Sequence, residues 1–312
     1  MKNGRGVMLS LNPQPRIHGI CPLTAVPFRE DGSVDYAQFD RLIGSLMKTG
    51  VNGIGLFGVV SEFYKLTDAE KSELAHRMLK QMEGSGVYSL ISVTDHATEI
   101  AVRRARQFQE MGASCLMVLP PHFMNPSADQ LLWHLEAVAE AVTIPLIIQY
   151  APNETGVSIP PEVLVQIART HPHVMYKIEC SDPAAYSKQL LAMKPDLSIM
   201  NGYWGIHLID LLQIGGVGVM PGFSCCELYV EIYRRYNAQD PAGACRLHSK
   251  LVSYFVRWNT SVERVIAMEK EILRRRGMLE TACCRHPGYT LTPEDFTEID
   301  AFLGAFASDL AP

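Results

Sequence analysis

The feature that most constrains how this chain folds is a repeated alternation between short apolar runs and longer stretches with helical periodicity. The apolar runs cover residues 17–28, 53–58, 87–93, 114–119, 145–149, 173–179, 197–200 and 216–220. Short apolar runs are typical of strands buried on both faces, and the amphipathic stretches are typical of helices that cover a parallel sheet. Eight such units predict an α/β fold, a TIM (β/α)8 barrel. The alternative is an open doubly wound sheet, but the G-x-G-x-x-G turn of such a sheet does not follow the first run.

The same pattern divides the 312 residues into three parts. Residues 1–16 contain no apolar signal-peptide core and are interpreted as a loose N-terminal leader. Residues 17–238 hold the eight strand–helix units of the barrel. Residues 239–312 are expected to form a C-terminal three-helix module, broken at Asn259 and around Pro287, that packs on the barrel.

Net charge and the positions of the cysteines indicate which partners, metals and cellular compartment to expect. The net charge is -5 and no basic run occurs, so we expect no nucleic-acid partner. No apolar stretch approaches the length of a membrane span, so no membrane partner is expected either. The eight cysteines include no C-x-x-C pair. We therefore expect no metal site, no disulfide framework and a cytoplasmic protein with reduced thiols.

Lys177 is the strongest candidate for a catalytic group. The period of a strand puts Lys177 and Glu179 on one face of the run 173–179. If both faces of the strand are covered, the amine is removed from water and becomes a usable nucleophile that can form a Schiff base with a carbonyl substrate. The alternative interpretation is a lysine at a strand end that reaches into solvent.

Other polar residues also fall at the ends of expected strands, and in a TIM barrel these ends form one mouth where the active site lies. Glu62 and Glu179 are candidates for a general acid or base, although a helix-capping acid and a partner of a cation are the respective alternatives. His96 is a candidate acid or hydrogen-bond donor to the substrate, with a structural histidine as the alternative. Gln149 can only donate and accept hydrogen bonds, so we expect it to orient the substrate.

The sequence resembles the dihydrodipicolinate synthase and N-acetylneuraminate lyase family of class I aldolases and dehydratases. The resemblance is carried by residues 24–28, 58–62, 121–126, 145–156, 176–179 and 215–222. It implies a barrel whose lysine on strand six, here Lys177, forms a Schiff base with pyruvate or another 2-keto acid. It also implies a homotetramer built as a dimer of dimers.

The resemblance assigns further substrate contacts. Val60 and Ser61 match the loop that binds the substrate carboxylate, where backbone N–H groups can serve as donors. Independently of the resemblance, Trp204 follows the expected seventh strand at the same mouth and is expected to wall the pocket, with plain packing as the alternative. Gly222 closes the stretch 215–222, whose glycines are interpreted as letting the backbone approach the lysine, with a phosphate-binding loop of a phosphate-dependent barrel enzyme as the alternative.

The departures from the family pattern concern the hydroxyl groups of its proton relay. Val59 and Val60 stand where the family usually has two threonines, and Gln149 stands in place of the catalytic tyrosine. Phe123 matches the tyrosine that the family borrows from a neighbouring subunit, and Glu154 matches the arginine that binds the second substrate of the synthases. These changes weigh against dihydrodipicolinate synthesis and look more like the 2-keto-3-deoxy sugar acid branch, which includes 2-keto-3-deoxy-L-arabonate dehydratase.

The expected function is therefore a lyase that acts on a 2-keto-3-deoxy sugar acid through a Schiff base at Lys177, with no cofactor. Dehydration and pyruvate-releasing cleavage share their early steps, and both stay open at this point. The alternatives are a dihydrodipicolinate synthase or N-acetylneuraminate lyase-type aldolase, and a catalytically impaired family member that only binds a keto acid.

Overall fold

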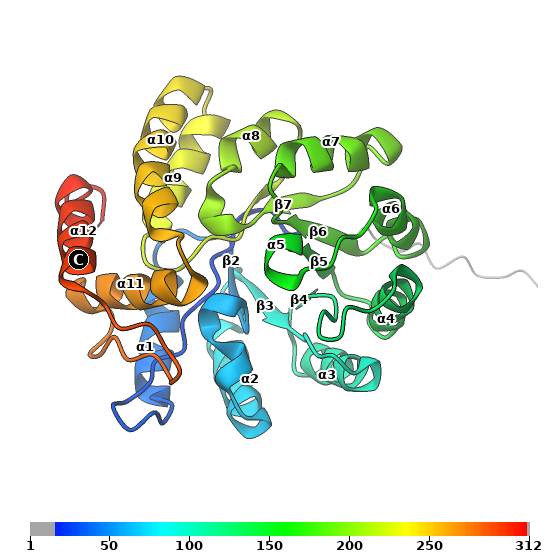
Figure 1. Ribbon diagram of the computed structural model, residues 1–312, viewed down its shortest axis with the longest axis horizontal. Coiled ribbons are helices and arrows are strands. Elements are labelled where there is room, and N and C mark those ends of the chain that lie inside the picture. Colours follow the sequence, from blue (N-terminus) through cyan, green and yellow to red (C-terminus); the bar gives the residue numbers. More distant parts are fainter. Residues whose placement is uncertain (1–15, 311–312) are drawn as a thin grey trace, which may run out of the picture.

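The computed structural model describes residues 16–310, so the expected leader lies outside the described residues except for Arg16. Eight parallel strands stand at the centre of the molecule (Figure 1). They are β1 Gly19–Ile20, β2 Gly53–Leu56, β3 Tyr88–Ser92, β4 Cys115–Val118, β5 Leu146–Tyr150, β6 Val174–Ile178, β7 Ile199–Asn201 and β8 Gly218–Val219. Each strand from β2 to β8 pairs with its neighbour in the chain, and β1 pairs with β8. The predicted (β/α)8 barrel is confirmed.

The barrel closes between β1 and β2 through a β-bridge and a backbone hydrogen bond just beyond β1. Leu23 forms a parallel bridge with Gly55, and the Gly55 amide donates to the Pro22 carbonyl at 2.7 Å. The expected first strand over residues 17–28 is shorter in the structure, where β1 covers only Gly19–Ile20. Backbone hydrogen bonds continue past β1, because the N–H groups of Cys21 and Leu23 donate to the Val219 and Pro221 carbonyls at 2.9 and 3.0 Å.

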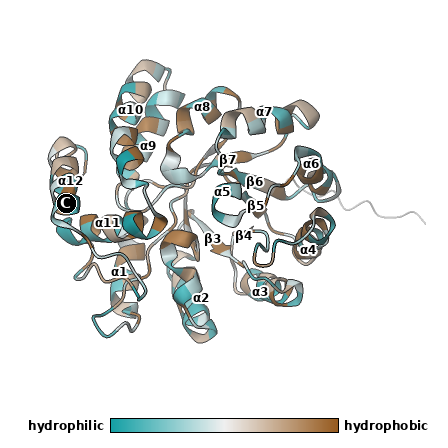
Figure 2. Cartoon of the chain, viewed as in Figure 1, coloured by the Kyte–Doolittle hydropathy of each residue, from teal (hydrophilic) through white to brown (hydrophobic). Residues whose placement is uncertain are grey.

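The helices form a ring around the strands, with the apolar faces inward and the polar faces outward (Figures 1 and 2). They are α1 Tyr36–Leu46, α2 Asp68–Met82, α3 Thr98–Glu110, α4 Ala128–Glu140, α6 Pro161–Thr170, α7 Pro183–Met193, α8 Leu208–Gln213 and α9 Cys226–Asn237. Helix α2 begins with the capping box that the sequence predicts, because Thr67 and Glu70 satisfy each other's backbone donors. Within 16–310, every helix is too short or too polar to span a lipid bilayer.

Short helical turns lie in the loops that follow the strands. They are η1 Val59–Ser61, η2 Phe63–Lys65, α5 Pro152–Thr155 and η3 Tyr203–Gly205. Between β5 and α6, α5 forms one helical turn that begins at Pro152, where the fixed φ of proline suits the first helical position.

Three further helices follow the barrel: α10 Pro241–Trp258, α11 Val262–Arg275 and α12 Pro293–Ala305. Helix α10 packs against α9, whereas α11 contacts α12 and the η1 turn at the barrel mouth (Figure 1). The first break falls at Asn259, which caps α10, and the second lies in the loop that contains Pro287. The domain boundaries at 16/17 and 238/239 stay a prediction.

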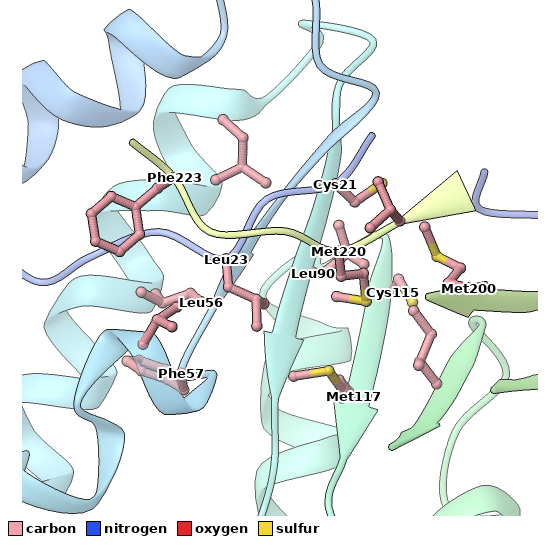
Figure 3. Packing of buried hydrophobic residues seen from close by; sticks show 14 of the residues in the cluster. Cys21, Leu23, Leu56, Phe57, Leu90, Cys115, Met117, Met200, Met220 and Phe223 are labelled. Carbon is pink, nitrogen blue, oxygen red and sulfur yellow. The ribbon is translucent and has the colours of Figure 1, made fainter. Parts of the chain in front are cut away.

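The interior of the barrel is filled by side chains. Cys21, Leu90, Cys115, Met200 and Met220 are all buried and gather inside the ring of strands (Figure 3). Burial raises the pKa of the Cys21 and Cys115 thiols, which keeps both neutral. A packed interior leaves room for a ligand only above the ends of the strands.

Candidate active site

A cavity opens at the carboxyl ends of the strands, and Lys177 lies on its wall. The cavity is lined by Leu23, Val59, Val60, Leu119, Gln149, Ala151, Glu154, Lys177, Glu179, Tyr203, Trp204, Met220, Pro221, Gly222 and Val262. Lys177 is only 2% exposed and is in register with Gln149 of β5 and Met200 of β7. Because residues in register on neighbouring strands point to the same face, Lys177 and Gln149 both project to the inside of the barrel.

Three donors converge on the carboxylate of Glu179, which follows β6. The Lys177 Nζ lies 3.0 Å from Glu179 Oε1, and the backbone N–H of Tyr203 donates to the same oxygen at 2.8 Å. The Gln149 side-chain amide donates to the other oxygen, Oε2. The carboxylate is therefore fixed in orientation beside the amine, which is the arrangement that a positioned acid or base requires.

The turn after β7 has no room to spare beside this carboxylate. A Cβ added to Gly202 would lie 2.0 Å from Glu179 Oε1, so only glycine fits there. The next two residues, Tyr203 and Trp204, both have φ of 49°, a left-handed conformation that is costly without glycine. The Tyr229 hydroxyl holds the turn by donating to the Trp204 carbonyl. The turn thus presents the side chains of Tyr203 and Trp204 to the cavity.

Gly222 lines the cavity, and Glu269 of α11 lies directly behind it. A Cβ at Gly222 would lie 2.0 Å from Glu269 Oε1. Glu269 is fully buried, and Ser224 Oγ donates to its Oε1 at 3.1 Å. Burial raises the pKa of Glu269 to about 7, although the hydrogen bond from Ser224 opposes the rise.

The structure does not bring Glu62 to the cavity. Glu62 has a left-handed φ of 53° and is fully buried. Its carboxylate is paired with Lys270 of α11 and with Lys65 Nζ at 3.0 Å, and accepts from the backbone N–H of Arg285 at 3.1 Å. This geometry corrects the expected acid–base position: Glu62 joins the η1 turn to the C-terminal helices, and its oxygens face cations instead of the substrate space.

Of the other expected contacts, Val60, Gln149, Trp204 and Gly222 line the cavity, whereas Ser61 and His96 do not. The Ser61 hydroxyl donates to the Thr24 carbonyl at 2.6 Å, and its backbone N–H to Gly58 at 2.9 Å, so both donors are already used. His96 is exposed and stands 4.6 Å from the His122 ring. Partial burial, with His122 adding to it, lowers the pKa of His96.

Sequence reasoning did not propose Tyr203 or Glu154 as functional residues of the cavity. The Tyr203 hydroxyl accepts a hydrogen bond from Asn153 Nδ2 at 2.8 Å and also faces Glu154. The place of Tyr203 directly after β7 could have identified it as a cavity residue, because position at a strand end already indicated its neighbour Trp204. Glu154 was noticed only as the replacement of an arginine, although a carboxyl at a barrel mouth is itself a candidate.

The arrangement joins an amine nucleophile, a fixed carboxylate and a mostly apolar wall. An amine in a cavity of this kind can condense with a ketone, and the neighbouring carboxylate can move protons at the carbon beside the former carbonyl. Within residues 16–310, no cluster of three or more histidine, cysteine, aspartate or glutamate side chains has metal-binding geometry.

Comparison with known proteins agrees with this geometry. Residues 16–305 match the model of the dihydrodipicolinate synthetase family. The fold is similar to the crystal structure of dihydrodipicolinate synthase from Rhodopseudomonas palustris, with a TM-score of 0.85 at 24% identity, covering 92% of this chain and 97% of that one.

Similar curated proteins carry three kinds of name. The chain is 26% identical to a 4-hydroxy-tetrahydrodipicolinate synthase from Phocaeicola vulgatus over 78% of this chain and 82% of that protein. It is 26% identical to a protein named as a probable 2-dehydro-3-deoxy-D-pentonate aldolase from Escherichia coli, over 76% of this chain and 80% of that protein. It is also 26% identical to an L-2-keto-3-deoxyarabonate dehydratase from Azospirillum brasilense, over 91% and 93%. The chain therefore belongs to the dihydrodipicolinate synthetase family and is, like the other members of that family, a lyase.

Proposed function

We propose that this lyase dehydrates a 2-keto-3-deoxy sugar acid, of the 2-keto-3-deoxy-L-arabonate type, through a Schiff base at Lys177. The observation that carries the proposal is the pair formed by the buried Lys177 amine and the Glu179 carboxylate, 3.0 Å apart at the wall of the cavity. The amine supplies the electron sink, so the reaction needs no cofactor.

The reaction begins when the Lys177 amine attacks the C2 ketone and water is lost, which gives an iminium ion. The iminium draws electrons from C3, and Glu179 accepts the C3 proton to leave an enamine. The enamine then expels the C4 hydroxyl. Hydrolysis of the resulting unsaturated imine releases the product and restores the lysine.

The lining of the cavity argues against dihydrodipicolinate synthesis. Val59, Val60 and Gln149 offer no hydroxyl where that reaction needs a proton relay. Glu154 places a carboxyl where a second substrate carboxylate would have to bind. Losing one charge-assisted contact costs about 1.5–3 kcal/mol, and a like charge in its place adds to the cost. The likeness to the Azospirillum dehydratase over nearly the whole chain supports the sugar-acid branch.

We also propose that the active form is a homotetramer in the cytoplasm. Phe123 and Met124, in the loop after β4, are 72% and 85% exposed, and Trp133 on α4 is exposed as well. Adjacent large apolar side chains that are this exposed, such as Phe123 and Met124, are typical of a surface that another subunit covers. The eight cysteines are free thiols, which suits a reducing compartment.

The test is an assay of the purified protein with 2-keto-3-deoxy pentonates and hexonates, beside pyruvate plus aspartate semialdehyde. Water loss without release of pyruvate is the expected result with at least one sugar acid. Release of pyruvate would identify an aldolase instead. Efficient condensation in the second assay alone would identify a synthase, and no turnover in either would identify a keto-acid binder.

A further inference from the structure

Tyr203 contacts the carboxyl groups of two residues that line the cavity. Its backbone N–H donates to Glu179 Oε1 at 2.8 Å, and its hydroxyl, held by Asn153 Nδ2 at 2.8 Å, faces the Glu154 carboxyl. The left-handed φ of Tyr203 makes both contacts available to one residue, and strain of this kind persists where the surrounding structure holds it. The turn therefore fixes two acids around one substrate space.

The two carboxyls stand in different surroundings. Glu179 faces three hydrogen-bond donors, the Lys177 Nζ, the Gln149 side-chain amide and the Tyr203 backbone N–H, which fix its carboxyl group beside the amine. Glu154 belongs to α5 and is exposed as a whole residue, although it also lines the cavity. Loss of water around that carboxyl raises the pKa of Glu154, and the Glu179 charge adds to the rise, whereas Tyr203 and Lys177 oppose it. A carboxyl in this situation holds its proton to a higher pH than an ordinary glutamate.

A dehydration needs a group for each of two protons. One group must take the C3 proton, and another must protonate the C4 hydroxyl so that it leaves as water. Two carboxyls in different environments are the usual way in which one site performs both tasks. Glu179 lies beside the Lys177 amine, and Glu154 lines the same cavity and faces the Tyr203 hydroxyl.

We propose that Glu154 is the general acid that donates a proton to the departing C4 hydroxyl, and that Tyr203 is the positioning residue that aims it. This inference rests on the proposed function. In the step, the enamine nitrogen restores the C=N bond, the C2–C3 π electrons form the C3–C4 double bond, and the C4–O bond breaks. The oxygen takes the Glu154 proton and leaves as water, while Glu179 keeps the proton from C3. Solvent resets both carboxyls.

The experiment compares the full-length wild-type protein with Glu154→Gln and with Glu162→Gln, a control on the exposed first turn of α6. Three readouts are taken: borohydride trapping of pyruvate on Lys177, deuterium exchange at C3 of pyruvate, and dehydration of a 2-keto-3-deoxy pentonate. Glu154→Gln is expected to keep trapping and exchange within about threefold of wild type and to lose dehydration by ~10²–10⁴-fold. The control is expected to match wild type in all three.

A substrate analogue separates proton donation from a structural effect. A C4-chloro analogue expels chloride, which needs no proton, so Glu154→Gln is expected to eliminate it at nearly the wild-type rate. In wild type, dehydration should fall as pH rises through the raised Glu154 pKa, and this fall should be missing from C3 exchange and from the chloro substrate.

The outcomes separate the two proposals. No trapping at Lys177 in wild type overturns the proposed function and the role of Glu154 with it. Trapping and exchange in wild type, combined with undiminished dehydration by Glu154→Gln, overturn the role of Glu154 alone. A parallel loss of trapping, exchange and dehydration in Glu154→Gln would also overturn the role of Glu154. The same holds if that variant fails to eliminate chloride from the chloro analogue, or if the wild-type protein cleaves the C3–C4 bond instead of dehydrating the substrate.

Discussion

Lys177 Nζ lies 3.0 Å from Glu179 Oε1, across two residues of one strand end. Successive odd positions of a strand face the same side, so the sequence Lys-Ile-Glu delivers the amine and the carboxylate to one cavity. The intervening Ile178 is fully buried on the other side. Nucleophile and proton acceptor are therefore coupled by the pleat of β6, and the turn after β7 locks the carboxylate from the facing side.

The first prediction concerns Glu179. Glu179→Gln is expected to lower turnover of a 2-keto-3-deoxy sugar acid by ~10²–10⁴-fold, because a positioned proton acceptor is removed. Gly202→Ala should cause a comparable loss with Glu179 still present, since the added methyl group would displace the carboxylate. Both variants should still trap pyruvate on Lys177 after long incubation. Steady-state kinetics with either variant close to wild type would show that Glu179 does not move the proton.

The second prediction treats Glu62 as a structural anchor. Lys270→Met leaves the buried Glu62 carboxylate with Lys65 as its remaining cation. Breaking a buried ion pair costs about 3–5 kcal/mol, and because one partner remains we expect the lower end. The double variant Glu62→Gln/Lys270→Met should recover part of the loss, measured as the midpoint of denaturant unfolding. If Glu62→Gln instead folds normally and stops pyruvate trapping, the carboxylate has a catalytic role after all.

The third prediction is a pH dependence of stability that originates at Glu269. Its pKa is raised from 4.5 to about 7 in the folded protein, so between these values the folded state keeps a proton that the unfolded state has lost. Raising the pH through this window therefore destabilises the fold, by an amount on the order of 3 kcal/mol. Glu269→Gln should gain stability relative to wild type at pH 8 but much less at pH 5. Thermal denaturation of both proteins at the two pH values checks this, and an equal difference at both contradicts it.

The fourth prediction concerns assembly. Light scattering on the purified protein is expected to give about four times the chain mass of 34.7 kDa. Phe123→Asp should shift the population to smaller species, because it puts a charge on the exposed apolar loop, whereas Phe123→Leu keeps the apolar surface and should remain a tetramer. A wild-type mass of 34.7 kDa would show that this loop serves another purpose.

Features that depend on the short sequence periods of strands and helices could be predicted from the sequence. Features that depend on contacts between residues far apart in the chain could not. The barrel was predicted from eight repeated units, and the shared face of Lys177 and Glu179 was predicted from the period of a strand. Glu62 also follows a strand, but its left-handed φ turns the carboxylate toward Lys270, which lies 208 residues further along the chain. No local sequence pattern indicates a partner so far along the chain.

Tyr203 shows the same limit on a smaller scale. Its place after β7 puts it at the mouth, but its contacts depend on two consecutive left-handed residues, which sequence preferences do not suggest. Ser61 shows the opposite case, because a hydroxyl expected to bind a substrate is used by the Thr24 carbonyl of a neighbouring strand end.

Schiff-base formation at Lys177 can be tested by borohydride reduction in the presence of pyruvate, followed by peptide mass spectrometry. The Schiff-base mechanism predicts one adduct, on Lys177, and no adduct in Lys177→Ala or Lys177→Arg, since a guanidinium does not deprotonate in a protein and cannot act as the nucleophile. Circular dichroism should show both variants folded. An adduct on a different lysine, or a wild-type protein that turns over its sugar acid with no adduct at Lys177, would contradict it.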